Sequence, residues 1–349
     1  MQIDRRQFLL TALGGPGLAS RKPAPAPLLD RGFARVTKIA DGLSVTIADP
    51  NKGPQCLSNG GVIFGRHAAL IVEGHFQPEG AALEIEAARL VSKAPIMAAV
   101  DTHYHLDHSF GNLSYANQHI PIMAHVQAPA LMKARYADLK GIDKAPLLAP
   151  LERKVAQAAN PDDRRHFQSD LDGAKWMFDA IDTVTLAYPT QLFAAKDLPK
   201  RIDLGGLTAI VEFHRGHTPT DLIVTVPERD VVFTGDLLFH RAYPVSFDAD
   251  MNAWHGVLTL FAGYGRQMRF VPGHGPICGL ETVREQVDIL DDLRSHAEKM
   301  IRTGASVDEA ERRYMVPKRF QDFDVSPWNW TVGAALQGYY AALISVKPT

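Results

Sequence analysis

The chain has few cysteines and lacks several common catalytic signatures. Cys56 and Cys278 are the only cysteines among its 349 residues and form no C-x-x-C pair, which excludes a thiolate zinc knuckle and a thioredoxin-like motif. No G-x-S-x-G elbow, Walker A loop or dinucleotide-binding glycine fingerprint occurs, which argues against a serine esterase and against nucleotide-dependent enzymes. Whether the two cysteines pair is left open, because pairing depends on the redox compartment.

An excess of charge and long hydrophobic runs are also missing. The formal net charge is -2, with 37 Lys and Arg residues against 39 Asp and Glu residues. A chain without a basic field has little attraction for a nucleic-acid backbone, so we expect a small-molecule substrate and no nucleic-acid partner. No segment after the N-terminal region approaches the roughly 20 apolar residues that span a bilayer, so we expect no integral membrane segment in the mature protein.

The first 20 residues resemble an export signal. Arg5 and Arg6 precede a short, weakly apolar run over residues 8–19, which is the order found in twin-arginine signals. We therefore interpret residues 1–20 as a twin-arginine signal peptide and residues 21–32 as a Pro/Ala linker. This interpretation predicts a periplasmic or secreted protein.

The pattern after residue 32 alternates short strands with helices. Segments rich in Val and Ile predict a first set of strands at 43–48, 61–64, 68–72 and 96–100, with a helix at 79–92. A second set is predicted at 201–204, 207–213, 222–226, 231–234 and 268–271, with a helix at 254–261. Two sets of strands with helices indicate an α/β protein, in which two sheets form a sandwich covered by helices on its outer faces (αββα).

Two further regions are predicted to be helical. Residues 128–182 are polar, and we interpret them as a helical insertion beside the functional site. After residue 281 the chain is mostly helical, and Ser306 with Glu309 fits a capping box. We divide the chain into a sandwich domain at 33–295, which contains the insertion, and a C-terminal helical extension at 296–349.

Histidine and aspartate side chains follow the predicted strands. The run H-Y-H-L-D-H at 103–108 comes directly after the strand at 96–100, and four possible ligands in six residues can surround metal ions only from a loop. Further candidates follow later strands, each beside a glycine that lets the backbone turn sharply. The expected metal ligands are His103, His105, Asp107, His108, His217, Asp236 and His274.

In this order, the motifs H-x-H-x-D-H, G-H-T, T-G-D and P-G-H-G resemble those of the metallo-β-lactamase superfamily over about residues 33–280. The resemblance implies a metallo-β-lactamase sandwich that binds two zinc ions (Zn2+). The first would be held by His103, His105 and His217, the second by Asp107, His108 and His274, and Asp236 would bridge them. It also implies hydrolysis by a hydroxide shared between the metals, with Asp107 as the catalytic residue that orients it and shuttles its proton.

Asp236 sets the chain apart from the antibiotic-degrading members, which place Cys or Ser there. An Asp at this position is the pattern of thioesterases, lactonases, phosphotriesterases and RNA-processing nucleases in the wider superfamily. We therefore expect hydrolysis of small-molecule ester, lactone, thioester or amide bonds, with β-lactam hydrolysis as an alternative. The resemblance also leaves room for an iron-dependent persulfide dioxygenase, with iron on His103, His217 and Asp236, and for a non-catalytic accessory protein of a quinoprotein or sulfur-oxidation system.

Several residues near the motifs have more than one interpretation. Asp101 either holds a ligand imidazole by its other nitrogen or forms a turn. His214 is expected to be structural because the ligand set is complete without it, whereas His240 could approach the pocket. Four aromatic residues either line a substrate pocket or belong to the core: Tyr104, Tyr243, Phe247 and Trp254.

Overall fold

The computed structural model describes residues 26–321, 323 and 332–345. The expected signal peptide at 1–20 and the start of the expected linker lie outside these residues. At the end of the segment expected to be a linker, β1 (Leu29–Asp30) pairs antiparallel with β2 (Ala34–Ala40). The sheet therefore begins before residue 33.

The first sheet has eight strands in the order β1-β2-β3-β4-β5-β6-β7-β8. Strands β1 to β5 pair antiparallel, and β5 to β8 pair parallel. The predicted strands are confirmed, whereas β1, β2, β7 and β8 were not predicted because they are short or half exposed and give little periodic signal. The remaining bounds are β3 (Leu43–Ala48), β4 (Gly60–Phe64), β5 (Ala69–Val72), β6 (Ile96–Val100), β7 (Ile122–His125) and β8 (Gln191–Phe193).

The second sheet has five strands in the order β13-β12-β11-β10-β9. All of them lie at the predicted positions, but β13 continues to His274 rather than ending at Val271, and β12 continues to Phe239 rather than ending at Thr234. The extension arises because β12 keeps pairing parallel with β13 through register shifts at Gly235 and Phe239. The bounds are β9 (Lys200–Asp203), β10 (Thr208–Phe213), β11 (Leu222–Val226), β12 (Val231–Phe239) and β13 (Arg269–His274).

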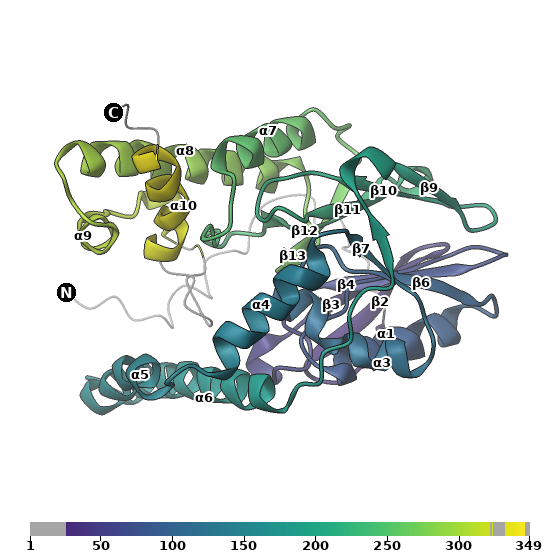
Figure 1. Ribbon diagram of the computed structural model, residues 1–349, viewed down its shortest axis with the longest axis horizontal. Coiled ribbons are helices and arrows are strands. Elements are labelled where there is room, and N and C mark those ends of the chain that lie inside the picture. The colour runs from purple at the N-terminus through teal and green to yellow at the C-terminus, as the bar shows by residue number, and fades with distance from the viewer. Residues whose placement is uncertain (1–25, 322, 324–331, 346–349) are drawn as a thin grey trace, which may run out of the picture.

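Alternation along the strands gives each sheet two apolar faces. Val231 on β12 packs between the sheets, while Val232 packs beneath α7 (Met251–Ala262) and α8 (Leu280–Arg302). In the first sheet, Ile63 faces the other sheet and Val62 faces α1 (Pro78–Val91). Because side chains alternate with period two, each sheet buries both faces, and each buried Val or Ile contributes about 1.5–3 kcal/mol. The result is the predicted αββα sandwich (Figure 1).

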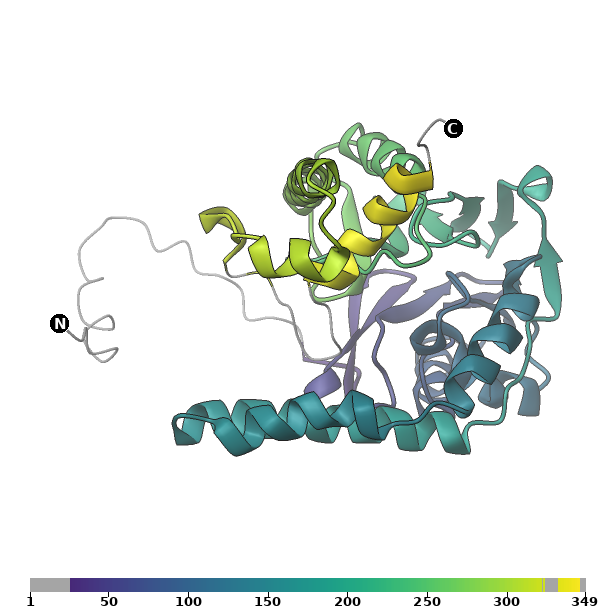
Figure 2. The same ribbon diagram turned by 60° about the vertical axis from the view of Figure 1, so that its left-hand side comes forward.

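The insertion predicted at 128–182 consists of α4 (Ala128–Lys140), α5 (Ala145–Gln157) and α6 (Pro161–Thr183). The Asn160 side chain caps α6 by accepting from the backbone N–H groups of Asp162 and Asp163. Helices α5 and α6 pack against each other and project as a pair beyond the sheets (Figure 2). No helix of the described chain is long and apolar enough to cross a membrane.

The C-terminal helices share a core with the second sheet. Helix α8 is continuous across the expected boundary at residue 295, and α9 (Val307–Arg313) and α10 (Val332–Ser345) pack against it. As predicted for the N-cap, the Ser306 side chain accepts from the Glu309 backbone N–H. Shorter helices connect these elements: α2 (Leu106–Ser109), α3 (Leu113–Asn117), and the 3-10 helices η2 (Pro50–Lys52), η3 (Phe110–Asn112), η4 (Ala195–Asp197), η5 (Pro227–Arg229) and η6 (Lys318–Phe320).

The two cysteines lie in different parts of the core and are both free. Cys56 is buried beneath the first sheet with the residues that pack on α1, and Cys278 pairs its backbone with Phe270 beside the second sheet. Burial raises the pKa of the Cys278 thiol to about 12, against a lowering contribution from Thr282. The Cys278 thiol is therefore a poor nucleophile in the folded protein, and burial shields the Cys56 thiol from reagents in solution.

We predict that a disulfide-exchange reagent detects both thiols per chain only after unfolding. At pH 8, far below the raised pKa, Cys278 is almost entirely protonated, so its reaction in the folded protein should be slower than that of a free thiol by roughly a hundredfold or more. Thiol titration before and after denaturation, without reductant, measures this. Absence of thiols after unfolding would instead indicate a Cys56–Cys278 disulfide.

Candidate metal centre

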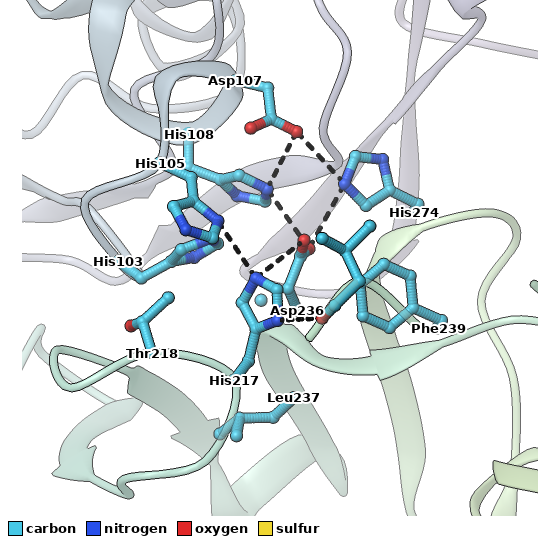
Figure 3. Close-up of polar contacts among 12 residues, drawn as sticks. His103, His105, Asp107, His108, His217, Thr218, Asp236, Leu237, Phe239 and His274 are labelled. Carbon is cyan, nitrogen blue, oxygen red and sulfur yellow. Dashed lines mark hydrogen bonds and ion pairs between the residues drawn. The ribbon is translucent and has the colours of Figure 1, made fainter. Parts of the chain in front are cut away.

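The seven predicted ligands meet at one edge of the sandwich, where strands of both sheets end (Figure 3). The first sheet supplies the segment 103–108, which leaves β6 and enters α2. The second sheet supplies His217 from the loop between β10 and β11, Asp236 from β12 and His274 from the end of β13. Rigid strands thus hold short loops whose side chains converge.

Two glycines are required for this convergence. Gly235, directly before Asp236, has a φ of +50°, a left-handed conformation that favours glycine. A Cβ at Gly273 would lie 1.8 Å from Oδ1 of Asp236, so a side chain there would displace the carboxylate. The glycines of T-G-D and P-G-H-G therefore let β12 and β13 approach each other beside the ligands.

The ligand atoms fall into two groups, each with all its atoms within 4.8 Å of one another. In the three-histidine group (His103, His105 and His217), Nδ1 of His105 lies 3.1 Å from Nε2 of His217. In the mixed group (Asp107, His108, Asp236 and His274), Nε2 of His274 lies 3.3 Å from Oδ2 of Asp107. The structure thus brings together all the residues that the sequence predicted as ligands.

Asp236 links the two groups through its two carboxylate oxygens. Its Oδ1 lies 3.2 Å from Nε2 of His108 and 3.3 Å from Nε2 of His274. Its Oδ2 faces the other group, 3.5 Å from Nε2 of His217. A carboxylate with one oxygen toward each group has the geometry of a bridging metal ligand.

The donor atoms fit divalent metal ions. Nε2 of His103 is buried and has no hydrogen-bond partner among the described residues, while its Nδ1 lies 3.2 Å from the Thr102 hydroxyl. A buried imidazole nitrogen without a partner is costly, and a metal ion would satisfy its lone pair. Imidazole and carboxylate are also the ligands that zinc accepts.

Burial sets the protonation of two residues of the three-histidine group, His103 and His217. It disfavours the charged imidazolium, so the pKa of His217 falls to about 3 and that of His103 lies well below its usual range. Both imidazoles are therefore neutral at pH 7, with a lone pair available for a metal ion.

In the mixed group, charge pairing outweighs burial. Burial opposes the charged form, yet the Asp236 carboxylate raises the pKa of His274 to about 9 and that of His108 well above its usual range. Conversely, these imidazoles hold the pKa of Asp107 and Asp236 well below the usual range of a carboxyl group, against the effect of burial. The carboxylates thus remain ionised and attract positive charge to this position.

Partners outside the ligand set orient the imidazoles. Oε2 of Glu73 lies 2.9 Å from Nδ1 of His108, and Oδ2 of Asp248 lies 3.0 Å from Nε2 of His105. The Asp248 carboxylate also accepts from the Tyr104 hydroxyl. Each contact fixes one nitrogen of the ring, so that the other nitrogen faces the metal position. Sequence reasoning missed both acids, because neither belongs to a motif with the ligands.

Asp101, one of the sequence candidates for this role, does not contact a ligand imidazole in the described structure. Its Oδ2 accepts from the Asn112 side chain at 2.7 Å, which ties the end of β6 to η3. Glu73 has the role that was considered for Asp101. It follows β5, the strand beside β6, and its carboxylate contacts the His108 ring and accepts from the Thr102 hydroxyl. The only available signal was an acidic residue at the end of a buried apolar strand.

The remaining candidates separate into core and site residues. His214 lies outside both ligand groups, as predicted, and His240 lies near Thr282 rather than in the pocket. Trp254 and Tyr243 are buried in the core beneath the second sheet. Phe247 lines the pocket, with its ring 5.1 Å from that of His105.

A pocket of about 430 Å³ opens above the ligands. His105, Asp107, His217, Asp236 and His274 form its base. Its walls come from the helical insertion, through Leu139, Met177 and Ile181, and from α9 and α10. The volume lies within the range of small-molecule sites.

Fold and site together define the class of protein. The family model described as Metallo-beta-lactamase superfamily matches residues 53–274, more than half of the chain. The chain therefore belongs to the metallo-β-lactamase superfamily. The comparison with curated proteins gave no match.

Solved structures share the fold at low sequence identity. A metallo-beta-lactamase from Pontibacter korlensis matches with a TM-score of 0.52 and 18% identity, over 74% of this chain and 99% of its own. The stereoselective inverting sec-alkylsulfatase Pisa1 from Pseudomonas sp. matches with a TM-score of 0.58 and 16% identity, over 89% of this chain. That match spans only 50% of the alkylsulfatase. At these identities the similarity shows the fold alone.

We predict that Glu73→Gln and Asp248→Asn weaken metal binding at different positions. Glu73 supports the mixed group and Asp248 the three-histidine group, so each variant should lower the affinity of its own group for a metal ion by roughly 10- to 100-fold. Competition with a chromophoric chelator, together with elemental analysis, measures affinity and stoichiometry.

Glu152→Gln is the matched control, because Glu152 is an exposed acid on α5, away from the ligands. Metal binding by this variant should equal that of the parent protein. If Glu73→Gln and Asp248→Asn also bind both ions as tightly as the parent, the two carboxylates do not orient metal ligands.

Proposed function

We propose that this chain is a zinc-dependent hydrolase with two metal ions, acting on ester, lactone, thioester or amide bonds of small molecules. The observation that carries the proposal is the pair of complete ligand groups, with one oxygen of Asp236 facing each. Bound zinc would supply an activated water at neutral pH and polarise the oxygen of the scissile group. Membership of a superfamily rich in hydrolases supports the same reaction class.

Asp107 is the ligand residue best placed to handle a proton. Its side chain is 22% exposed, whereas those of His108, Asp236 and His274 are 0%, 6% and 9% exposed. It also lines the pocket, so its carboxylate can accept a hydrogen bond from a water molecule beside the scissile bond. We therefore assign Asp107 the role of orienting that water and moving its proton.

The structure favours two metal ions over the single iron of a persulfide dioxygenase. One iron on His103, His217 and Asp236 would leave Asp107, His108 and His274 without a function, although their atoms lie within 3.4 Å of a neighbouring group member. Hydrolysis of β-lactams and hydrolysis of sulfate esters are alternative substrate specificities of the same proposed site. The first corresponds to the lactamases and the second to the alkylsulfatase among the structural neighbours.

A panel of chromogenic and coupled substrates tests the proposal. The zinc-loaded protein would be assayed with aryl esters, lactones, S-lactoylglutathione, a phosphotriester, a cephalosporin and an alkyl sulfate. We expect turnover of one class, lowered roughly 100-fold or more in Asp107→Ala because the variant loses both a ligand and the proton-handling group. Glu152→Gln should retain parental turnover.

If the protein with two zinc ions bound turned over none of these substrates, the result would contradict a general hydrolase. Iron in the purified protein, with oxygen uptake on glutathione persulfide, would support the dioxygenase instead. If variants of Asp107 and His108 also left every cellular phenotype unchanged, an accessory role would be supported.

We also propose export to the periplasm or beyond, on the basis of Arg5 and Arg6 and the following apolar run. Replacement of both arginines by lysine should leave the chain in the cytoplasm, because the twin-arginine pathway reads the pair itself. Cell fractionation of the full-length chain measures this. Unchanged export of the variant would contradict a twin-arginine signal.

A further inference from the structure

The pocket above the ligands contains a single arginine and no lysine among its described lining residues, and that arginine is Arg135 on α4. The acids that line the pocket outside the ligand groups are Asp308 and Glu311, both on α9. Helices α4 and α9 lie apart in both ribbon views (Figures 1 and 2). The pocket walls therefore have a positive side at α4 and a negative side at α9.

Arg135 is partly buried, and its guanidinium forms no ion pair with a described carboxylate. Its Nε is buried and has no hydrogen-bond partner among the described residues, and no described carboxylate lies within ion-pair distance of its guanidinium. Asp248, whose pKa the charge of Arg135 helps to lower, already contacts His105 and Tyr104. Because Arg135 lines the pocket and no described carboxylate pairs with it, its guanidinium is available to an anionic ligand in the pocket.

The position of Arg135 is fixed relative to the metal centre. Its guanidinium lies 4.8 Å from the centroid of the Phe247 ring, and that ring lies 5.1 Å from the ring of His105. A cation stacked on an aromatic face keeps its edge donors free for a planar anion. One aromatic ring thus separates the Arg135 guanidinium from a predicted zinc ligand.

One part of the pocket wall is apolar. Leu57, Leu139, Met177 and Ile181 line it without offering a hydrogen bond from their side chains. Such surfaces favour apolar ligand groups by burying them from water.

We propose that the site selects amphiphilic anions: small acid derivatives with an anionic group close to the scissile bond and an apolar remainder. Arg135 binds the anionic group on the Phe247 side of the metal centre, and the apolar remainder lies against the leucine, methionine and isoleucine side chains. Asp308 and Glu311 repel the anion from the opposite side and so fix the orientation of the substrate. The proposal rests on the hydrolase function proposed above and specifies its substrate class.

Binding of a non-hydrolysable ligand pair tests the anion site independently of catalysis. Octane-1-sulfonate and uncharged methyl octyl sulfone share a chain length, and a sulfonate is a weak zinc ligand. Calorimetric titration of the zinc-loaded protein should show tighter binding of the sulfonate by roughly 10-fold or more, the effect of a hydrogen bond to a charged group. Arg135→Gln should abolish this preference, and Arg135→Lys should restore it only in part, because lysine lacks the planar fork.

Lys133→Gln is the matched control: it removes one positive charge from the same helix at an exposed position outside the pocket. The parental preference should persist in this variant. Zinc content and circular dichroism confirm that each variant is folded and loaded. Equal affinity of the parent for both ligands, or equal losses in Arg135→Gln and Lys133→Gln, would overturn the proposal.

Kinetics with a matched ester pair separates this proposal from the hydrolase function. The 4-nitrophenyl monoester of glutaric acid carries a carboxylate that the valerate ester lacks. We expect Arg135→Gln to lower the ratio of their kcat/KM values roughly 10-fold or more, mainly through the KM of the charged ester. Hydrolysis of both esters with an unchanged ratio would overturn the anion site and keep the hydrolase. Arg135-dependent sulfonate binding without any hydrolysis would keep the anion site and contradict the hydrolase.

Discussion

The carboxylate of Asp236 lies between ligands that come from both sheets, and its place there depends on the close approach of β12 and β13. Gly273 permits that approach because a Cβ at this position would collide with Oδ1 of Asp236. The end of β13 is also held against the first sheet, because the side chain of Asn59, directly before β4, donates to the backbone carbonyls of Pro272 and Gly275. The relative position of the two ligand groups therefore follows from how the sandwich closes.

The two groups differ in their electrostatic properties. In the three-histidine group burial keeps His103 and His217 neutral, whereas in the mixed group the pairing of Asp107 and Asp236 with imidazoles outweighs the effect of burial. Two acids outside the groups orient their imidazoles: Glu73 contacts the ring of His108, and Asp248 contacts the ring of His105. Imidazole nitrogens alone on one side, and imidazoles together with ionised carboxylates on the other, make the two groups chemically distinct, although one oxygen of Asp236 faces each.

Motifs made the ligands predictable, because each follows a strand whose apolar pattern is strong, such as Ile96–Val100. The same patterns predicted the sandwich and the helical insertion. Sequence could not identify Glu73, Asp248 or Arg135, since each acts through a contact with a residue far away in the chain and carries no local signature. It also placed the end of β12 too early, because the pairing with β13 that extends the strand is a long-range interaction.

Most of the pocket wall comes from α4, α6, α9 and α10, none of which contributes to the ladders of either sheet. The chemistry and its selectivity are thus encoded in separate stretches of the chain. Insertions and substitutions in the helical walls can accumulate during divergence without disturbing the strands that hold the ligands. A lineage with this architecture can change the shape and charge of its pocket while it inherits the two groups of histidine and aspartate side chains intact.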